Sequence, residues 1–240
     1  MALRANVYGK LRDNFMREAP NITRKSLSAT EHDLRVEVVQ HRLIATKLSI
    51  LRNKTTALEE FRRNLQELST LLLGEAARAW ETASVQIETP LRECSGEILR
   101  RPVVLVPILR AGLGMVDGML RILPDAHIGH IGIYRNEETL RPVTYFCRLP
   151  VNLAEAQVVL LDPMLATGNS ACEAATVLKA QGAQRIQFLC LVACPPGVKQ
   201  LQSVHPDVAI VTAAIDPELN EFGYIVPGLG DAGDRYFGTG

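Results

Sequence analysis

Residues 158–170 read Val-Val-Leu-Leu-Asp-Pro-Met-Leu-Ala-Thr-Gly-Asn-Ser, and this stretch predicts a strand, a loop and a helix in succession. Four apolar residues without polar alternation are typical of a strand buried on both faces. Asp162 ends that strand, and small residues lead into a helix predicted over 171–181. Their N–H groups would gather at the helix N-terminus, where partial positive charge favours a phosphate. A plain strand–turn–helix connection, capped by Thr167 or Asn169, explains the stretch equally well on its own.

Four other short apolar runs predict further strands. They occupy residues 103–106, 128–133, 186–192 and 208–213. Helix-like stretches follow two of these runs, at 114–123 and 195–204. Strands that alternate with helices favour an α/β fold with a mainly parallel sheet and right-handed crossovers. Because ligands of such sheets bind at the carboxyl ends of the strands, we expect the functional site in the loops at those ends.

A helix is predicted upstream of these strands. The string Thr56-Ala57-Leu58-Glu59 has the pattern of a capping box, with Thr56 as the cap. Apolar residues at helical spacing follow, namely Leu58, Phe61, Leu65, Leu68 and Leu72. This apolar stripe is expected to face the core or a subunit interface.

Composition and charge are those of an ordinary globular chain. The sequence has 240 residues, of which 47% are hydrophobic, with 26 basic and 26 acidic side chains. This length fits one large α/β domain or two small ones. The balanced charge argues against a nucleic-acid partner. Since no apolar run reaches the roughly 18 residues of a membrane span, we expect no transmembrane helix and no membrane partner.

The N-terminal region differs from the rest of the chain. Residues 1–36 are polar and weakly periodic, which predicts a partly disordered or loosely helical extension before a domain over 37–240. The extension lacks the apolar segment of a secretory signal, so we expect a cytoplasmic protein. The five cysteines include no C-x-x-C pair, which favours buried thiols over disulfides or metal ligands.

Three further segments are suited to charged or planar ligands. Residues 106–115, Val-Pro-Ile-Leu-Arg-Ala-Gly-Leu-Gly-Met, place Arg110 at a strand end, where its guanidinium could clamp two phosphate oxygens. Residues 133–139, Ile-Tyr-Arg-Asn-Glu-Glu-Thr, place Arg135 after another strand. Residues 224–235 contain four glycines and one proline, which predict a tightly shaped loop. A surface arginine beside a turn and a glycine-rich terminal turn are the plain alternatives.

The four segments together resemble a known family. A strand, an acid and Ala-Thr-Gly-x-Ser are similar to the 5-phospho-α-D-ribose 1-diphosphate (PRPP) motif of type I phosphoribosyltransferases, although Pro163 replaces their usual second acid. The string Asp-Pro-Met-Leu-Ala-Thr-Gly resembles one branch, the uracil phosphoribosyltransferase family. The other segments match that family in order, from about His41 to the end. The chain departs from it at Arg42, where proline is usual, and at Asn169, where a second glycine is common.

The resemblance implies a fold, an activity and a set of site residues. The fold would be that of type I phosphoribosyltransferases, a mainly parallel central sheet flanked by helices, with a β-arm over the active site. The activity would convert uracil and PRPP to UMP and diphosphate in pyrimidine salvage. Catalytic roles are implied for Arg110, Arg135 and Asp231. Uracil would be bound, mainly by main chain, at Ile225, Gly230, Asp231 and Ala232. PRPP would be bound by Arg110, Arg135, Asp162, Pro163, Met164, Leu165, Ala166, Thr167, Gly168, Asn169, Ser170 and Asp231.

The resemblance also implies partners. Mg²⁺ would arrive on PRPP, with no metal site built from protein side chains alone. A homodimer or higher homo-oligomer is expected, and GTP activates some members of the family.

Two other functions compete with this one. A PRPP-sensing regulator that binds RNA, with weak or no transferase activity, should have a basic face and the paired acids. The net charge of zero and the single acid at Asp162 argue against it. A transferase for a purine base is disfavoured because the whole C-terminal string is of the uracil type.

Overall fold

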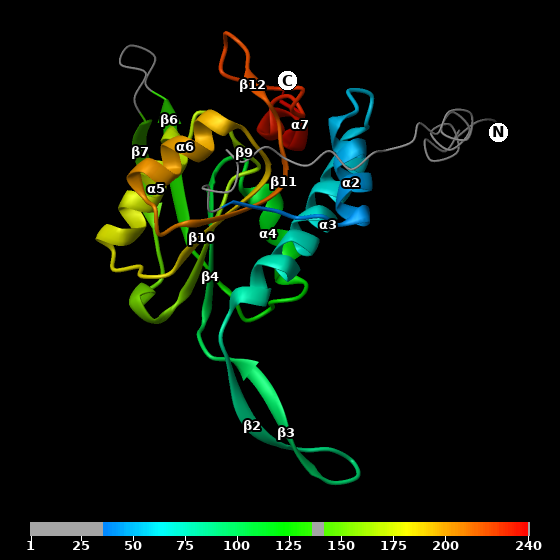
Figure 1. The fold of residues 1–240 in the computed structure, drawn as a ribbon, viewed down its shortest axis with the longest axis vertical. Coiled ribbons are helices and arrows are strands. Elements are labelled where there is room, and N and C mark those ends of the chain that lie inside the picture. Colours follow the sequence, from blue (N-terminus) through cyan, green and yellow to red (C-terminus); the bar gives the residue numbers. More distant parts are fainter. Residues whose placement is uncertain (1–35, 136–141, 240) are drawn as a thin grey trace, which may run out of the picture. The chain divides into compact units, whose positions relative to one another are not determined.

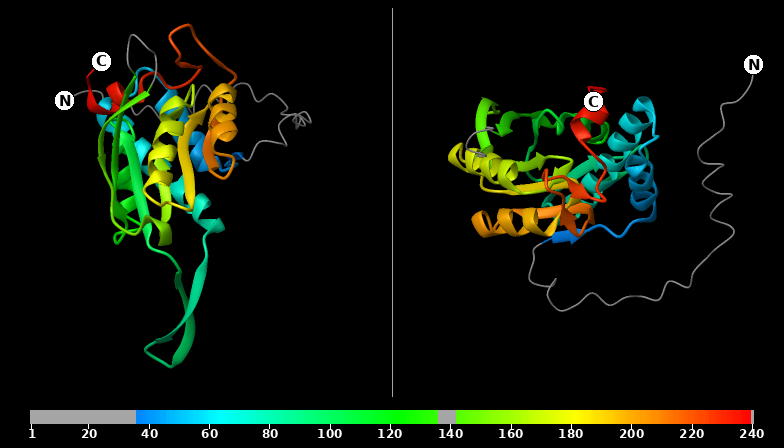
Figure 2. Two further views of the ribbon diagram at one scale, coloured as in Figure 1. Left: turned by 90° about the vertical axis from the view of Figure 1, so that its left-hand side faces the viewer. Right: turned by 90° about the horizontal axis from the view of Figure 1, so that it is seen from above.

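The computed structural model describes residues 36–135 and 142–239. Its centre is a nine-stranded sheet with helices on both faces (Figure 1, Figure 2). The strands of this sheet are β1 (Val36–Val38), β4 (Val103–Leu109), β5 (His127–Ile128), β6 (His130–Arg135), β7 (Pro142–Arg148), β8 (Gln157–Leu161), β9 (Met164–Leu165), β10 (Ile186–Ala193) and β11 (Ala209–Ile215). Four of the five strands predicted from apolar runs are present as single strands, and the run 128–133 is divided at Gly129 between β5 and β6.

The loops predicted to bind ligands follow the carboxyl ends of β4, β6 and β8, which are parallel neighbours in the sheet. The strands run in the order β1-β11-β10-β8-β4-β6-β7, with β5 beside β4 and β9 beside β10. Among the described residues of this sheet, every pairing is parallel except that of β6 with β7. The mainly parallel sheet is thereby confirmed. The β6–β7 pair supplies two strands for the expected β-arm, but its connection at 136–141 lies outside the described residues, so the arm over the site stays a prediction.

The helices flank the sheet in two groups. They are α2 (Arg42–Arg52), α3 (Leu58–Ala76), α4 (Leu113–Leu120), α5 (Asn169–Ala180), α6 (Pro195–Val204), α7 (Ala232–Phe237) and the short 3₁₀ helices Ala77–Ala79 and Leu153–Glu155. Alternate residues of a strand point to opposite faces, so Val159 and Leu161 pack in one core and Val158 and Leu160 in the other. Helices α2, α3 and α4 complete the first core, and α5 and α6 the second. Burial on both faces explains why these strands are apolar throughout.

Two small antiparallel pairs lie outside the main sheet. Strands β12 (Glu218–Leu219) and β13 (Ile225–Val226) precede α7. Strands β2 (Thr82–Glu88) and β3 (Glu93–Leu99) form the β2–β3 hairpin, which extends away from the end of the domain that carries α7 (Figure 1). No continuous apolar run marks this hairpin in the sequence, and its residues are mostly exposed.

Several expectations need correction. Thr56 is not the cap of α3, because the helix begins after Ala57 and the Thr56 hydroxyl donates to the Ile50 carbonyl at 2.6 Å. All five cysteines are free, and three are buried as expected, but Cys94 is half-buried and Cys147 is exposed on β7.

The predicted N-terminal extension falls almost entirely outside the described residues, which begin at Val36, and its boundary stays a prediction. Among the helices that the structure describes, none is long and apolar enough to cross a membrane.

Candidate functional site

The loop between β8 and α5 has a tightly fixed backbone. Gly168, rather than Thr167 or Asn169, is the residue that caps α5, and its φ of +82° favours glycine. A Cβ there would lie 2.6 Å from the carbonyl oxygen of Gly197 in α6. Conversely, a Cβ on Gly197 would lie 2.5 Å from the Ala166 carbonyl. The loop therefore packs backbone against backbone on α6, and the first N–H groups of α5 have no partner within their own helix.

Asp162 follows β8 at the start of this loop. Its Oδ1 accepts a hydrogen bond from the Met164 N–H at 3.3 Å. Burial raises the pKa of the Asp162 carboxyl from 3.8 to about 7; the Met164 hydrogen bond opposes this rise, and the nearby charge of Asp231 adds to it. Two acids from distant parts of the chain therefore share one environment.

A cavity of about 240 Å³ joins three of the predicted segments. Asp162, Met164 and Ala166 come from the loop between β8 and α5 (residues 162–168), which is predicted to bind phosphate and is called the phosphate loop below, and Ala111 comes from the loop after β4. The remaining lining residues are Gly223, Tyr224, Ile225, Gly230, Asp231, Ala232 and Gly233. All four residues predicted to bind uracil thus line the same cavity as the acid of the phosphate loop.

Arg110 lies beside this cavity at the end of β4. Its side chain is 60% exposed, with Nη2 3.4 Å from Oδ1 of Asp234, and its guanidinium lies 5.7 Å from the ring centre of Phe237. An exposed pair at this distance is weak, so the guanidinium is available to an anionic ligand. A Cβ on the nearby Gly112 would lie 2.4 Å from the Leu161 carbonyl. The backbone of this loop therefore packs directly against the end of β8.

Arg135 is the last residue of β6, where its backbone pairs with Pro142. The residues that follow it in the predicted string, Asn136 to Thr139, lie outside the described part. The predicted contact of Arg135 with a diphosphate is therefore supported only by the position of Arg135 at the end of β6.

The C-terminal loop links β13 to α7 and contains two glycines in the left-handed region. Gly228 has φ +55°, and a Cβ there would lie 2.1 Å from the Ile225 carbonyl. Gly230 has φ +73°. Asp231 caps α7 by accepting from the Asp234 N–H at 2.8 Å. The loop presents backbone groups to the cavity in a conformation that other residues would strain.

Sequence reasoning missed three side chains that contact this loop. They are Arg52, Asp216 and Arg235, each of which forms a hydrogen bond with the main chain of the loop. No local pattern marks the first two, because they are 164 positions apart in the chain.

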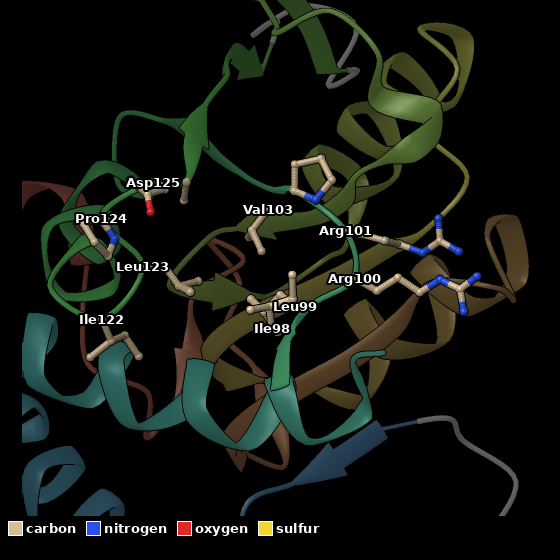
Figure 3. A pocket seen from close by; sticks show the side chains of 11 residues that line it. Ile98, Leu99, Arg100, Arg101, Val103, Ile122, Leu123, Pro124 and Asp125 are labelled. Carbon is tan, nitrogen blue, oxygen red and sulfur yellow. The ribbon is translucent and has the colours of Figure 1, made fainter. Parts of the chain in front are cut away.

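Further cavities among the described residues include two larger ones. One of about 460 Å³ lies at the base of the β2–β3 hairpin and contains none of the predicted site residues. In Figure 3 the side chains of Leu99, Val103 and Leu123 gather there, whereas Arg100 and Arg101 extend away. The other, of about 420 Å³, is lined by Lys54, Phe61 and Arg235 among others, and it shares Asp231 with the smaller cavity. The predicted uracil-binding residues and Asp162 line the 240 Å³ cavity rather than either of these larger ones.

Comparisons with known proteins agree with this geometry. The family profile "Uracil phosphoribosyltransferase" matches residues 38–239. A uracil phosphoribosyltransferase of Clostridium perfringens is 52% identical over 206 residues, covering 85% of this chain and 99% of its own. One from Pediococcus pentosaceus is 55% identical over 204 residues, covering 85% and 98%.

Solved structures share the fold. The AQ2163 protein from Aquifex aeolicus matches with a TM-score of 0.80 and 36% identity, covering 85% of this chain and 98% of its own. An adenine phosphoribosyl transferase from Trypanosoma brucei, at TM-score 0.54 and 12% identity over 79% of this chain and 87% of its own, shares the fold alone. The fold is that of the type I phosphoribosyltransferases, and the chain belongs to the uracil phosphoribosyltransferase family.

Proposed function

We propose that this protein transfers the phosphoribosyl group of PRPP to uracil, giving UMP and diphosphate. The observation that carries the proposal is the 240 Å³ cavity, in which Asp162 of the phosphate loop and the C-terminal loop from Ile225 to Ala232 meet. A ligand with a sugar phosphate at one end and a flat base at the other fits such a pairing of an anion-binding loop with a backbone-lined slot.

Each predicted site residue has a role in this proposal. The sugar 5′-phosphate binds the N–H groups of residues 166–170 at the N-terminus of α5. The carboxylate of Asp162 accepts hydrogen bonds from the ribose hydroxyls. The main chain at Ile225, Gly230 and Ala232 binds the edge of uracil. Asp231, which lines the cavity between them, contacts both substrates.

The reaction itself requires charge to be moved and neutralised. Uracil N1 forms a bond to the anomeric carbon of PRPP as the bond from that carbon to the diphosphate oxygen breaks. The bonding electron pair leaves with the diphosphate, and the N1 proton passes to solvent. Positive charge therefore develops on the ribose and negative charge on the leaving group. Arg110 and Arg135 at the strand ends stabilise the leaving group, and the two loops hold the reacting atoms together.

The donor set of the cavity is compatible with Mg²⁺. Asp162 and Asp231 bring carboxylate oxygens, the hard ligands that Mg²⁺ prefers, into one cavity, and together they are too few for a metal site made of protein alone. Mg²⁺ bound to PRPP would be held near these two acids and would neutralise diphosphate charge. This arrangement supports a Mg²⁺–PRPP complex as the substrate.

The experiment that tests the function measures UMP formation from uracil and PRPP with Mg²⁺, with cytosine, orotate and hypoxanthine as competing bases. Uracil-selective turnover is expected. Turnover with another base would assign a different transferase. Tight Mg²⁺-dependent PRPP binding without turnover on any base would favour the PRPP-sensing regulator and refute the proposed reaction.

Assembly, regulation and location belong to the same proposal. An isolated two-stranded hairpin is marginally stable in water, and the β2–β3 hairpin exposes Ile87, Leu91 and Ile98. Both facts support a homodimer or higher homo-oligomer, which light scattering would measure. Activation by GTP is tested by adding GTP to the UMP assay. Because PRPP and UMP are too highly charged to cross a bilayer unaided, the reaction belongs in the cytoplasm.

A further inference from the structure

The main chain of the C-terminal loop is held by an ion pair from distant elements. Asp216, which follows β11 and is buried, accepts from the Gly228 N–H at 2.8 Å. Arg52, the last residue of α2, donates to both carboxylate oxygens of Asp216 at 2.6 and 2.7 Å. It also donates to the Gly228 carbonyl at 2.7 Å. Both backbone groups of Gly228 are therefore engaged by this pair.

A second arginine fixes the next residue of the loop. Arg235 of α7 donates to the Leu229 carbonyl at 2.7 Å and to the Asn53 carbonyl, also at 2.7 Å. It donates as well to the carbonyl of Leu51, and its guanidinium lies 4.3 Å from the ring centre of Phe61. The end of α2 and the C-terminal loop are thus joined twice. The Arg52–Asp216 pair is the more informative of the two, because Arg235 lines the neighbouring 420 Å³ cavity, whereas Arg52 and Asp216 line neither cavity.

Recognition by main chain depends on a rigid loop. Uracil presents a carbonyl at ring position 4 and an N–H at position 3, whereas cytosine presents an amino group and an unprotonated nitrogen. A backbone that accepted cytosine equally well would have to exchange donors and acceptors by rotating peptide units. Gly228 and Gly230 have the freedom to do so unless they are held. In a rigid loop, cytosine would leave buried main-chain donors and acceptors unpaired, and this lowers its affinity relative to uracil.

We infer that Arg52 and Asp216 are positioning residues that fix the C-terminal loop and thereby set the preference for uracil over cytosine. The inference rests on the proposed function, since it concerns the base subsite of that reaction. The pair acts through Gly228 and not by touching the base. It joins three elements, α2, the end of β11 and the loop, into one frame around the base subsite.

The test compares four proteins. Asp216→Asn keeps the size of the side chain and removes its charge, and Arg52→Lys keeps the charge but loses the planar fork that grips both oxygens. Glu67→Gln is the matched control, because it removes an ion pair with Lys47 on the same helix α2 without touching the loop. Wild type is the reference. The measurements are KM for uracil, KM for PRPP, kcat, and the Kd values for UMP and CMP by calorimetry.

Asp216→Asn should raise KM for uracil about tenfold and lower the UMP-over-CMP preference by a similar factor, corresponding to one or two lost hydrogen bonds. KM for PRPP should stay within about twofold, because the phosphate loop is untouched. Arg52→Lys should raise KM for uracil and lower the base preference by smaller factors than Asp216→Asn does. Glu67→Gln should match wild type in both.

Three results would overturn the inference. The first is a lower thermal stability of Asp216→Asn and Arg52→Lys with unchanged KM for uracil and unchanged base preference. The Arg52–Asp216 ion pair would then be purely structural. The second is an equal rise in both KM values. The third is a wild-type protein that binds UMP and CMP equally. If Asp216→Asn fails to fold, Arg52→Lys decides the question alone. A wild type that binds UMP selectively but forms none would refute the proposed reaction, and the binding data would still test the pair.

Discussion

Replacing Asp162 with asparagine should stabilise the ligand-free protein above neutral pH while disabling it. The pKa of the Asp162 carboxyl is about 7 in the folded protein, mainly because of burial, against 3.8 when it is free in water. A carboxyl that holds its proton more tightly when folded contributes most to stability below about pH 4. That contribution is lost as the pH rises through about 7. At about 1.4 kcal/mol per pH unit the whole loss is about 4 kcal/mol, of which about 3 kcal/mol falls between pH 5 and pH 8.

Asparagine has nearly the same shape and no charge to bury. The free energy of unfolding of Asp162→Asn should therefore exceed that of wild type at pH 8 by more than it does at pH 5, with a difference of about 3 kcal/mol between the two gains. Urea denaturation followed by circular dichroism at both pH values measures it. Asp117→Asn, the same change at an exposed site, is the control for replacing a carboxylate with an amide.

Activity should move in the opposite direction. A neutral amide accepts hydrogen bonds from the ribose hydroxyls less strongly than a carboxylate, so kcat/KM for PRPP should fall about 10- to 100-fold. If wild type and Asp162→Asn lost stability in parallel between pH 5 and pH 8, burial of the Asp162 charge would not be the cause, and the reasoning would fail.

Other predictions follow from the same geometry. Arg110→Ala should lower kcat by about 100-fold or more while leaving the Kd for UMP within about threefold, because its guanidinium serves the leaving group; near-normal turnover would remove that role. Gly168→Ala should raise KM for PRPP, since its φ is +82° and a Cβ would lie 2.6 Å from a carbonyl of α6; an unchanged KM would contradict this. In urea denaturation, Gly118→Ala should destabilise by about 1–3 kcal/mol, because its Cβ would lie 2.1 Å from a carbonyl of α3. Gly74→Ala, a helical site with open space around it, should instead stabilise by about 0.5–1 kcal/mol.

The central sheet could be predicted from the sequence because burial on both faces leaves a strong signal. Residues 158–161 are apolar at every position, and each of them lies in one of the two cores. Residues 186–192 in β10 are also buried throughout, and all of them except Gln187 are apolar. The apolar runs therefore located these strands, and their alternation with helices predicted the parallel arrangement.

The β2–β3 hairpin left no comparable signal. Its strands are solvated on much of both faces and contain no continuous apolar run. Thr82–Glu88 instead alternates polar and apolar residues with a period of two, a strand pattern that a reading based on apolar runs passes over. The helix starts were missed for a related reason. Thr56 and Thr167 resemble helix caps in the sequence, but contacts within the folded chain determine which residue caps each helix. The Thr56 hydroxyl donates to the carbonyl of Ile50, which precedes it in the chain.

The candidate site divides in the same way. Its ligand-facing loops were predictable because glycines and small residues at strand ends are unusual and follow a family pattern. The support behind those loops was not. Arg52 and Asp216 look like an ordinary helix-end arginine and an ordinary loop acid, and only the folded chain brings them together across 164 positions.

The backbone-lined cavity has a consequence for redesign. Of its lining residues, Ile225, Gly230 and Ala232 bear no polar side chain that could be exchanged to suit another base. An enzyme that recognises its substrate by side chains can drift to a new one by single substitutions. Here a new base would require a loop of different length or path, with new anchors behind it. Specificity of this kind resists stepwise evolution, and directed libraries aimed at another base should vary the loop itself rather than the residues that line it.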